Sequence, residues 1–182
     1  MSFRFEPLAI PDVVLVRPTR HEDQRGYFEE TYRRSAFAEA GIVADFVQDN
    51  FARSRRNVLR GLHYQLPPAA QAKLVGVAAG RVFDVAVDLR AGSATFGRWV
   101  GTVLSDTNQH QLWIPPGYAH GYVVLSEVAD FEYKCTDYYD PKSEAGVVWN
   151  DPQLGIEWPI SEPTLSAKDR LLPRLAELTR RR

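Results

Sequence analysis

The sequence predicts an all-β fold, organised as a closed or double-sheet barrel of the jelly-roll kind. Between residues 45 and 149 the apolar stretches are short, and several show the two-residue alternation of half-buried strands. Glycine and proline separate these stretches at close intervals. Cys135 is the single cysteine, so the Cys–Trp–Cys framework of an immunoglobulin domain is missing. A jelly roll is therefore preferred, with a small-ligand site at its mouth.

The expected elements follow one another along the chain. A first strand at 13–16 ends before Pro18, and an aromatic strand follows at 27–32. Ser35 is expected to cap a short helix that ends at Gly41. Further strands are expected at 46–51, 57–65, 73–78, 82–89, 99–104, 111–114, 118–125, 129–137 and 147–149, followed by a C-terminal helix at about 173–179.

Length and composition restrict the class of protein. The 182 residues fit a single domain spanning 1–182. With 22 basic and 23 acidic residues the net charge is -1, so no global field attracts nucleic acid or a membrane. One cysteine excludes an intrachain disulfide and favours a reducing compartment. No apolar run reaches the roughly 18 residues of a membrane span. We expect a cytoplasmic protein without nucleic-acid or membrane partners.

The stretch 60–65, Arg-Gly-Leu-His-Tyr-Gln, carries the strongest functional signal. Residues two apart on a strand share a face, so Gly61, His63 and Gln65 are expected to line one side. Gly61 removes side-chain bulk beside His63, as a close ligand would require. An inward histidine on a strand is a base, a metal ligand or a satisfied core residue, and this stretch alone leaves all three open.

A metal site is one of these alternatives. Zinc and iron sites usually need three protein ligands, often including two histidines two positions apart on one strand. Here Gln65 stands two positions after His63, and no glutamate follows within the next several residues. His120 is a second candidate ligand, but His21 and His110 lie in polar turns and leave the set incomplete. We expect no metal and no other cofactor.

Short motifs follow one another over nearly the whole chain. They are Arg25-Gly-Tyr-Phe-Glu-Glu30, Gln48-Asp-Asn50, Arg60-Gly-Leu-His-Tyr-Gln65, Gln71-Ala-Lys73, Val82-Phe-Asp-Val-Ala-Val-Asp88, Trp113-Ile-Pro-Pro-Gly-Tyr-Ala-His120, Tyr133-Lys-Cys-Thr-Asp-Tyr-Tyr139 and Lys168-Asp169. In this order the set resembles the dTDP-4-dehydrorhamnose 3,5-epimerases, from about residue 13 to residue 173. The resemblance implies a cupin-like jelly roll that works as a homodimer without a metal. It also implies inversion of C3 and C5 of dTDP-4-dehydro-6-deoxy-glucose, giving dTDP-4-dehydro-L-rhamnose in dTDP-L-rhamnose biosynthesis.

The resemblance assigns the catalytic roles. His63 matches the base that removes protons acidified by the C4 ketone, and Asp169 would pair with its other ring nitrogen. Tyr133 matches the proton donor on the opposite face, where simple strand packing is the alternative. Lys73 matches the cation that faces the C4 oxygen, where a solvated edge lysine is the alternative. Asp169 could instead belong to a capping box with Ser166. No second His–Asp pair is evident, so one acid–base pair is expected to serve both carbons in turn.

Further positions match residues that contact the nucleotide sugar in the family. Arg25 and Arg60 match residues on the diphosphate, which suits the geometry of a guanidinium. Tyr138 can stack on the thymine or pack in the core. The other matching positions are Glu30, Gln48, Asn50, His120, Glu144 and Lys168.

Two positions depart from the family pattern. Gly76 stands where an arginine commonly follows the Lys-Leu-Val run, and Ala145 stands where a basic residue often follows Glu144. Both can alter contacts near the nucleotide or the barrel wall. The motifs also fit a 3- or 5-mono-epimerase of a dTDP-4-keto-deoxysugar in a secondary-metabolite pathway. From other classes, a metal-dependent cupin oxygenase lacks a third ligand, and a non-catalytic sugar-binding jelly roll has no use for a His–Asp pair.

Overall fold

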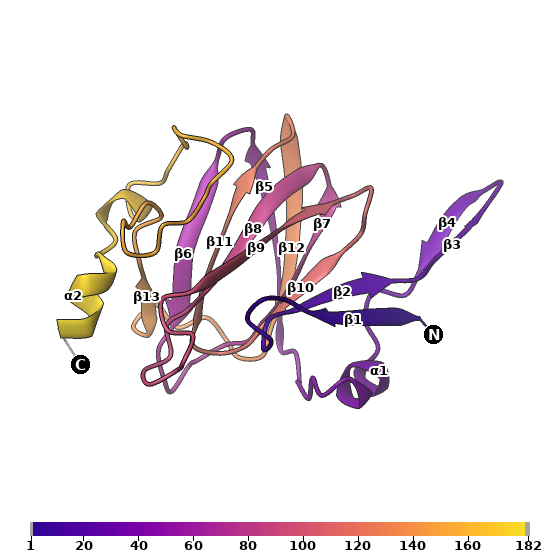
Figure 1. Ribbon diagram of the computed structural model, residues 1–182. Helices are drawn as coiled ribbons and strands as arrows, with labels where there is room; N and C mark the ends of the chain where they lie inside the picture. The colour runs from indigo at the N-terminus through magenta and orange to yellow at the C-terminus, as the bar shows by residue number, and fades with distance from the viewer. Residues whose placement is uncertain (1, 181–182) are drawn as a thin grey trace.

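The computed structural model describes residues 2–180, which are mostly β-sheet (Figure 1). The strands are β1 (Phe3–Pro7), β2 (Val14–Pro18), β3 (Arg20–Asp23), β4 (Gly26–Glu29), β5 (Gln48–Arg55), β6 (Leu59–Gln65), β7 (Lys73–Ala79), β8 (Arg81–Asp88), β9 (Trp99–Ser105), β10 (Gln111–Ile114), β11 (Tyr118–Val124), β12 (Val128–Cys135) and β13 (Glu144–Gly146). The helices are α1 (Arg34–Glu39), the 3-10 turn η1 (Asp169–Leu171) and α2 (Leu175–Arg180). None of the described helices is long and apolar enough to cross a membrane.

Two antiparallel sheets form the barrel. A six-stranded sheet has the order β1-β2-β10-β7-β12-β5, and a five-stranded sheet has the order β13-β6-β11-β8-β9. Neighbours in each sheet are mostly far apart in sequence, as in a jelly roll. The cupin-like jelly roll predicted from the sequence is confirmed. The hairpin β3–β4 belongs to neither sheet and projects away from the barrel (Figure 1).

The five-stranded sheet is buried on both faces. On β8, Val82 and Ala86 face the core between the sheets, whereas Val85 and Val87 pack in a second apolar layer with Leu154 and other residues of the C-terminal segment. Asp84 lies on the same face of β8 as Val82 and Ala86, so its carboxylate points into the barrel, where it is fully buried. This placement matters because a buried carboxylate needs a partner.

Several local expectations were wrong, and β5 extends to Arg55, four residues beyond its expected end at 51. Helix α1 begins after Arg33 without a side-chain cap, so Ser35 lies inside the helix and does not cap it. The last strand is Glu144–Gly146 and not 147–149, because the free edge of β6 pairs with these less apolar residues. The aromatic strand ends at Glu29, three residues earlier than expected, because Glu29 pairs with Arg20, the first residue of its hairpin partner β3.

Candidate active site

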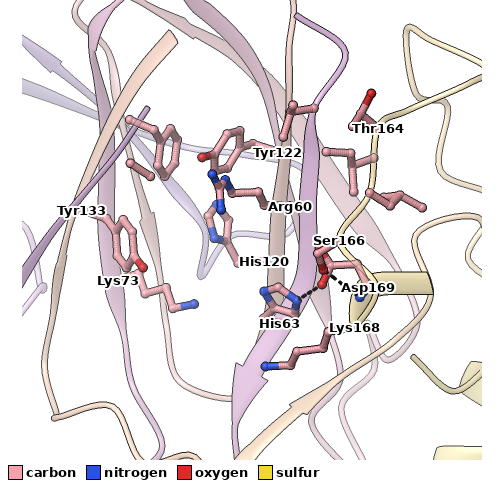
Figure 2. Close-up of a pocket in the computed structure, with 15 residues that line it drawn as sticks. Arg60, His63, Lys73, His120, Tyr122, Tyr133, Thr164, Ser166, Lys168 and Asp169 are labelled. Atoms are coloured by element: carbon pink, nitrogen blue, oxygen red, sulfur yellow. Dashed lines mark hydrogen bonds and ion pairs between the residues drawn. The ribbon is translucent and has the colours of Figure 1, made fainter. Parts of the chain in front are cut away.

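A cavity of about 440 Å³ lies between the two sheets. Figure 2 shows the side chains that converge on it from β6, β7, β11 and β12 and from residues 164–169. Its polar lining is formed by Arg60, His63, Lys73, His120, Tyr122, Tyr133, Thr164, Ser166, Lys168 and Asp169. Basic and acidic groups thus meet inside a chamber whose wall also contains apolar groups such as Val58 and Phe131.

The centre of the cavity wall is the His63–Asp169 pair. His63 Nε2 lies 2.6 Å from Asp169 Oδ1, and Figure 2 shows the other ring nitrogen of His63 facing the cavity. The His63 side chain is 29% exposed, whereas that of Asp169 is only 4% exposed. A ligand can therefore reach the imidazole while the carboxylate stays shielded behind it.

Hydrogen bonds keep Asp169 ionised. Burial raises the pKa of this carboxyl, but bonds from His63, the Ser166 hydroxyl and the Gly61 backbone N–H outweigh it, so the pKa is lowered overall. The Asp169 N–H also donates to Ser166 Oγ at 3.0 Å. Ser166 thus caps the turn, as the capping alternative expected, while the Asp169 carboxylate binds His63.

The C-terminal segment reaches His63 through a short pairing with the β5–β6 turn. Thr164 N–H donates to Asn57 O at 2.8 Å, and Leu59 N–H donates to Thr164 O at 3.0 Å. This contact fixes the chain a few residues before Asp169. His63 and Asp169 are therefore held together by backbone hydrogen bonds as well as by their own contact.

An irregularity in β6 places Arg60 and His63 on the same cavity, which strict alternation did not predict. The register between β6 and β11 shifts between these two residues. Gly61, at φ 127, occupies the irregularity, and a Cβ there would lie 2.6 Å from Gly121 Cα. The neighbouring strand therefore requires this glycine, and the earlier explanation by a close ligand was wrong.

Gln65 is the other departure from the expected face of β6. It is buried, and its Nε2 donates to the Ala69 and Tyr138 carbonyls at 2.8 and 3.2 Å. Its Oε1 accepts from Asp140 N–H at 2.7 Å. Gln65 therefore ties two loops together and does not line the cavity.

Lys73 and Tyr133 lie on the sheet that faces His63. The Lys73 ammonium is 5.9 Å from the centre of the Tyr133 ring, and neither forms an ion pair or hydrogen bond within residues 2–180. Burial lowers the pKa of Lys73, although Cys135, Asp84 and Glu144 oppose that effect. Burial is also the main cause that raises the pKa of Tyr133 to about 12. At neutral pH the phenol keeps its proton, as an acid opposite a base requires.

A second His–Asp pair stands beside the first, contrary to expectation. His120 Nε2 lies 2.9 and 3.1 Å from the two carboxylate oxygens of Asp84, and His120 is directly opposite His63 in the β6–β11 ladder. Burial raises the pKa of Asp84, and His120 followed by Lys73 lowers it in part. The inward position of Asp84 on β8 was the sequence signal that could have revealed this pair.

Other candidate residues lie at the cavity edge. Glu144 forms an ion pair with Lys168 and accepts a hydrogen bond from Tyr139 Oη at 2.6 Å. Burial raises the pKa of Glu144, but Lys168 and Tyr139 lower it overall. Gln48 Nε2 donates to Asn50 Oδ1 at 2.9 Å on β5, outside the cavity lining.

Arg25, Glu30 and Tyr138 are not brought to this cavity. Arg25 lies in the turn of the projecting β3–β4 hairpin and bonds Asp23, and Glu30 lies 3.4 Å from Arg33. Tyr138 is exposed, so it does not pack in the core. Within one chain, these three residues therefore do not line the cavity.

The two departures from the family pattern also lie elsewhere. Gly76 lines a separate hollow on the six-stranded sheet together with Phe51 and Gln111. Ala145 packs in the apolar layer beneath the C-terminal segment. Neither departure changes the lining of the cavity. Among the described residues, no group of three or more His, Cys, Asp or Glu side chains could hold a metal ion.

The fold and the cavity define the class of protein. A jelly-roll barrel that sets a histidine, paired with an ionised aspartate, opposite a protonated tyrosine and a lysine has the groups of a proton-transferring enzyme. Residues 7–177 match the sequence model of the family described as dTDP-4-dehydrorhamnose 3,5-epimerase, and the chain belongs to this family.

Relatives agree with this assignment. The dTDP-4-dehydrorhamnose 3,5-epimerase of Pseudomonas aeruginosa is 59% identical over 165 residues, 90% of this chain and 91% of the relative. The dTDP-4-dehydrorhamnose 3-epimerase of Streptomyces niveus is 41% identical over 96% of this chain and 84% of its own. A crystal structure of the Legionella pneumophila dTDP-6-deoxy-D-glucose-3,5-epimerase in complex with dTDP-4-keto-L-rhamnose has a TM-score of 0.92 and 50% identity, covering 96% of this chain and 93% of that one.

Proposed function

We propose that this protein inverts C3 and C5 of dTDP-4-dehydro-6-deoxy-glucose and so supplies dTDP-4-dehydro-L-rhamnose for dTDP-L-rhamnose biosynthesis. The observation that carries the proposal is His63 on one sheet, paired at 2.6 Å with Asp169 of the C-terminal segment, and Tyr133 on the facing sheet. A ring held between the sheets has a base on one face and an acid on the other. Inversion at a carbon requires this arrangement.

The proposed step is a proton transfer through an enolate. His63 removes the C–H proton, and the electrons of that bond move into the C4 carbonyl to give an enolate oxygen. Asp169 stabilises the imidazolium, and the Lys73 ammonium stabilises the oxygen charge in a partly dry site. Tyr133 then donates its proton to the same carbon from the opposite face. Exchange with solvent restores both residues for the second carbon.

His63 is proposed as the base for both carbons, although a second imidazole stands beside it. The His120 side chain is 8% exposed, and its Nε2 is directed at Asp84. The His63 side chain is 29% exposed. His120 is accordingly assigned to substrate binding.

The diphosphate is proposed to bind Arg60 and Lys168. The Arg60 side chain points into the cavity and has no ion-pair partner within the described residues. Lys168 lines the same cavity, and its only ion-pair partner among those residues is Glu144. Arg60 is thus available to an anionic ligand, and its guanidinium suits paired phosphate oxygens, while Lys168 can turn from Glu144 to the same ligand.

A homodimer would give the remaining candidates a role. Arg25 and Glu30 belong to the projecting hairpin region, where Phe28 is 71% exposed. We propose that this hairpin packs on a second copy and carries Arg25 and Glu30 to that copy's substrate. Light scattering should give a dimer at micromolar concentration, and Phe28→Asp should weaken it. A monomeric wild-type protein would contradict this part of the proposal.

Turnover in deuterated water tests the reaction. NMR of the product should show deuterium at both C3 and C5, and His63→Ala should lose about 10²–10⁴-fold in rate. Tyr133→Phe keeps the ring but removes the proton, so exchange should continue while inversion fails at one carbon or both. More than about a tenth of wild-type activity in His63→Ala would overturn the base assignment.

The pattern of label also decides between double and single epimerisation. Label at only one carbon in the wild type would identify a mono-epimerase. This is the second candidate function, because the chain is also similar to a dTDP-4-dehydrorhamnose 3-epimerase. His120→Asn serves as the control for the base. It should retain label at both carbons, whereas loss of label at one carbon would assign that carbon to His120.

A further inference from the structure

The hydroxyl of Tyr122 is buried without a partner. Tyr122 is 4% exposed, and its ring stacks on Phe131 with 4.0 Å between ring centres. Its Oη has no hydrogen-bond partner within the part of the chain that the structure describes. Such a hydroxyl costs folding free energy, because its bonds to water are lost and not replaced. Packing does not explain it, since a phenylalanine would stack equally well.

The surroundings of this hydroxyl point to an anion. Figure 2 shows it beside the guanidinium of Arg60 at the cavity wall. Burial raises the pKa of Tyr122, while Ser54 and Arg60 both lower it, so the two side chains lie close to the oxygen. Arg60 Nε donates to the buried Ser54 Oγ at 3.0 Å, which holds the guanidinium plane beside the Tyr122 hydroxyl.

We propose that Tyr122 is a further substrate-binding residue, donating a hydrogen bond to the anionic phosphate oxygen that Arg60 holds, and that Ser54 is a positioning residue for Arg60. A phosphate group offers several acceptor oxygens, so a guanidinium and a phenol can bind it together. The ligand would supply the partner that the Tyr122 hydroxyl lacks in the free protein. This inference rests on the proposed function, because it takes the ligand of Arg60 to be the diphosphate of a dTDP-sugar.

Two tyrosines on one face of β11 make a matched test. Tyr118 is buried like Tyr122, but its Oη accepts from Arg90 Nη2 at 2.7 Å and donates to Asp12 Oδ2 at 3.3 Å. Tyr122→Phe should weaken dTDP binding by about 10- to 150-fold, the range for a hydrogen bond to a charged group, and should leave Tm unchanged or raise it. Tyr118→Phe should lower Tm and leave dTDP affinity unchanged. Calorimetric titration and thermal unfolding measure both quantities, and thymidine, which has no phosphate, should bind all three proteins equally.

Ser54 is tested by its effect on KM. Ser54→Ala should raise KM for the sugar nucleotide with little change in kcat, and Ser54→Thr, which keeps the hydroxyl, should restore it. Equal dTDP affinity in wild type and Tyr122→Phe would overturn the proposal. A Tyr122→Phe protein that fails to fold would also overturn it, because the hydroxyl must then serve the fold. A wild type that binds dTDP but does not turn over the 4-keto sugar would refute the proposed function and leave this binding test intact.

Discussion

Replacing Asp169 with asparagine separates the charge of the His63 partner from its shape. Asparagine keeps an oxygen near His63, but it offers no negative charge to the imidazolium that forms when His63 takes a proton. The 2.6 Å contact is a charge-assisted hydrogen bond, and such bonds contribute ~1.5–3 kcal/mol. At about 1.4 kcal/mol per factor of ten, kcat should fall roughly 10- to 150-fold. KM should change little, because the Asp169 carboxylate is bonded to His63 and its side chain is only 4% exposed.

Initial rates of product formation at neutral pH, with thermal unfolding in parallel, measure this effect. Ser166→Ala is the control, since it removes the hydroxyl that accepts the Asp169 N–H at 3.0 Å and keeps the carboxylate. A lost cap costs ~1 kcal/mol of stability, so the control should be less stable. Because it also removes one of the bonds that lower the pKa of Asp169, its kcat should fall, but by less than that of Asp169→Asn. Asp169→Asn with more than half of the wild-type kcat would refute the reasoning. An equal loss of kcat in both variants would assign the effect to the geometry of the turn.

Three other outcomes are expected. Asp88 is fully buried and accepts hydrogen bonds from Arg90, Ser93 and Thr95, so Asp88→Asn should lower the free energy of unfolding by ~1.5–3 kcal/mol in chemical denaturation. Burial raises the pKa of Asp88, but these bonds lower it by more, so the pKa is lowered overall. The contribution of Asp88 to the free energy of unfolding is therefore present above about pH 4, the usual range of the carboxyl, and is lost in acid. An Asp88→Asn protein with the same acid sensitivity as the wild type would contradict this. Gly61→Ala should lose both stability and turnover, because the new Cβ would meet Gly121 backbone at 2.6 Å. Chelator treatment should leave turnover unchanged, and elemental analysis that finds about one transition metal per chain would contradict this.

The sheets were the most predictable part of the molecule. For β7 to β12 the expected bounds differ from the observed ones by two residues or fewer, and 111–114 coincides with β10. Glycine and proline mark the ends of several of these strands, such as Gly80 between β7 and β8 and Pro115 to Gly117 before β11, so their bounds are visible in the sequence. Helix α1 and β13 were placed less well, because their ends depend on contacts with segments that the local pattern does not contain.

The cavity was predictable as a set of residues and not as a geometry. The family resemblance named His63, Lys73, Tyr133 and Asp169, all of which line the cavity. Nothing local revealed the irregularity at Gly61, since it depends on the backbone of a strand about sixty positions later. The pairing of His120 with Asp84 was missed as well, because it joins two strands that are far apart in the sequence.

The contact between His63 and Asp169 joins residues 106 positions apart. A contact of this separation closes a long loop at a large cost in chain entropy, so we expect it to form late in folding, after strands nearer in sequence have paired. A refolding chain should therefore regain its circular dichroism before it regains turnover. Recovery of activity would then report when the C-terminal segment docks on the finished barrel, and the enzyme carries its own probe of that final step.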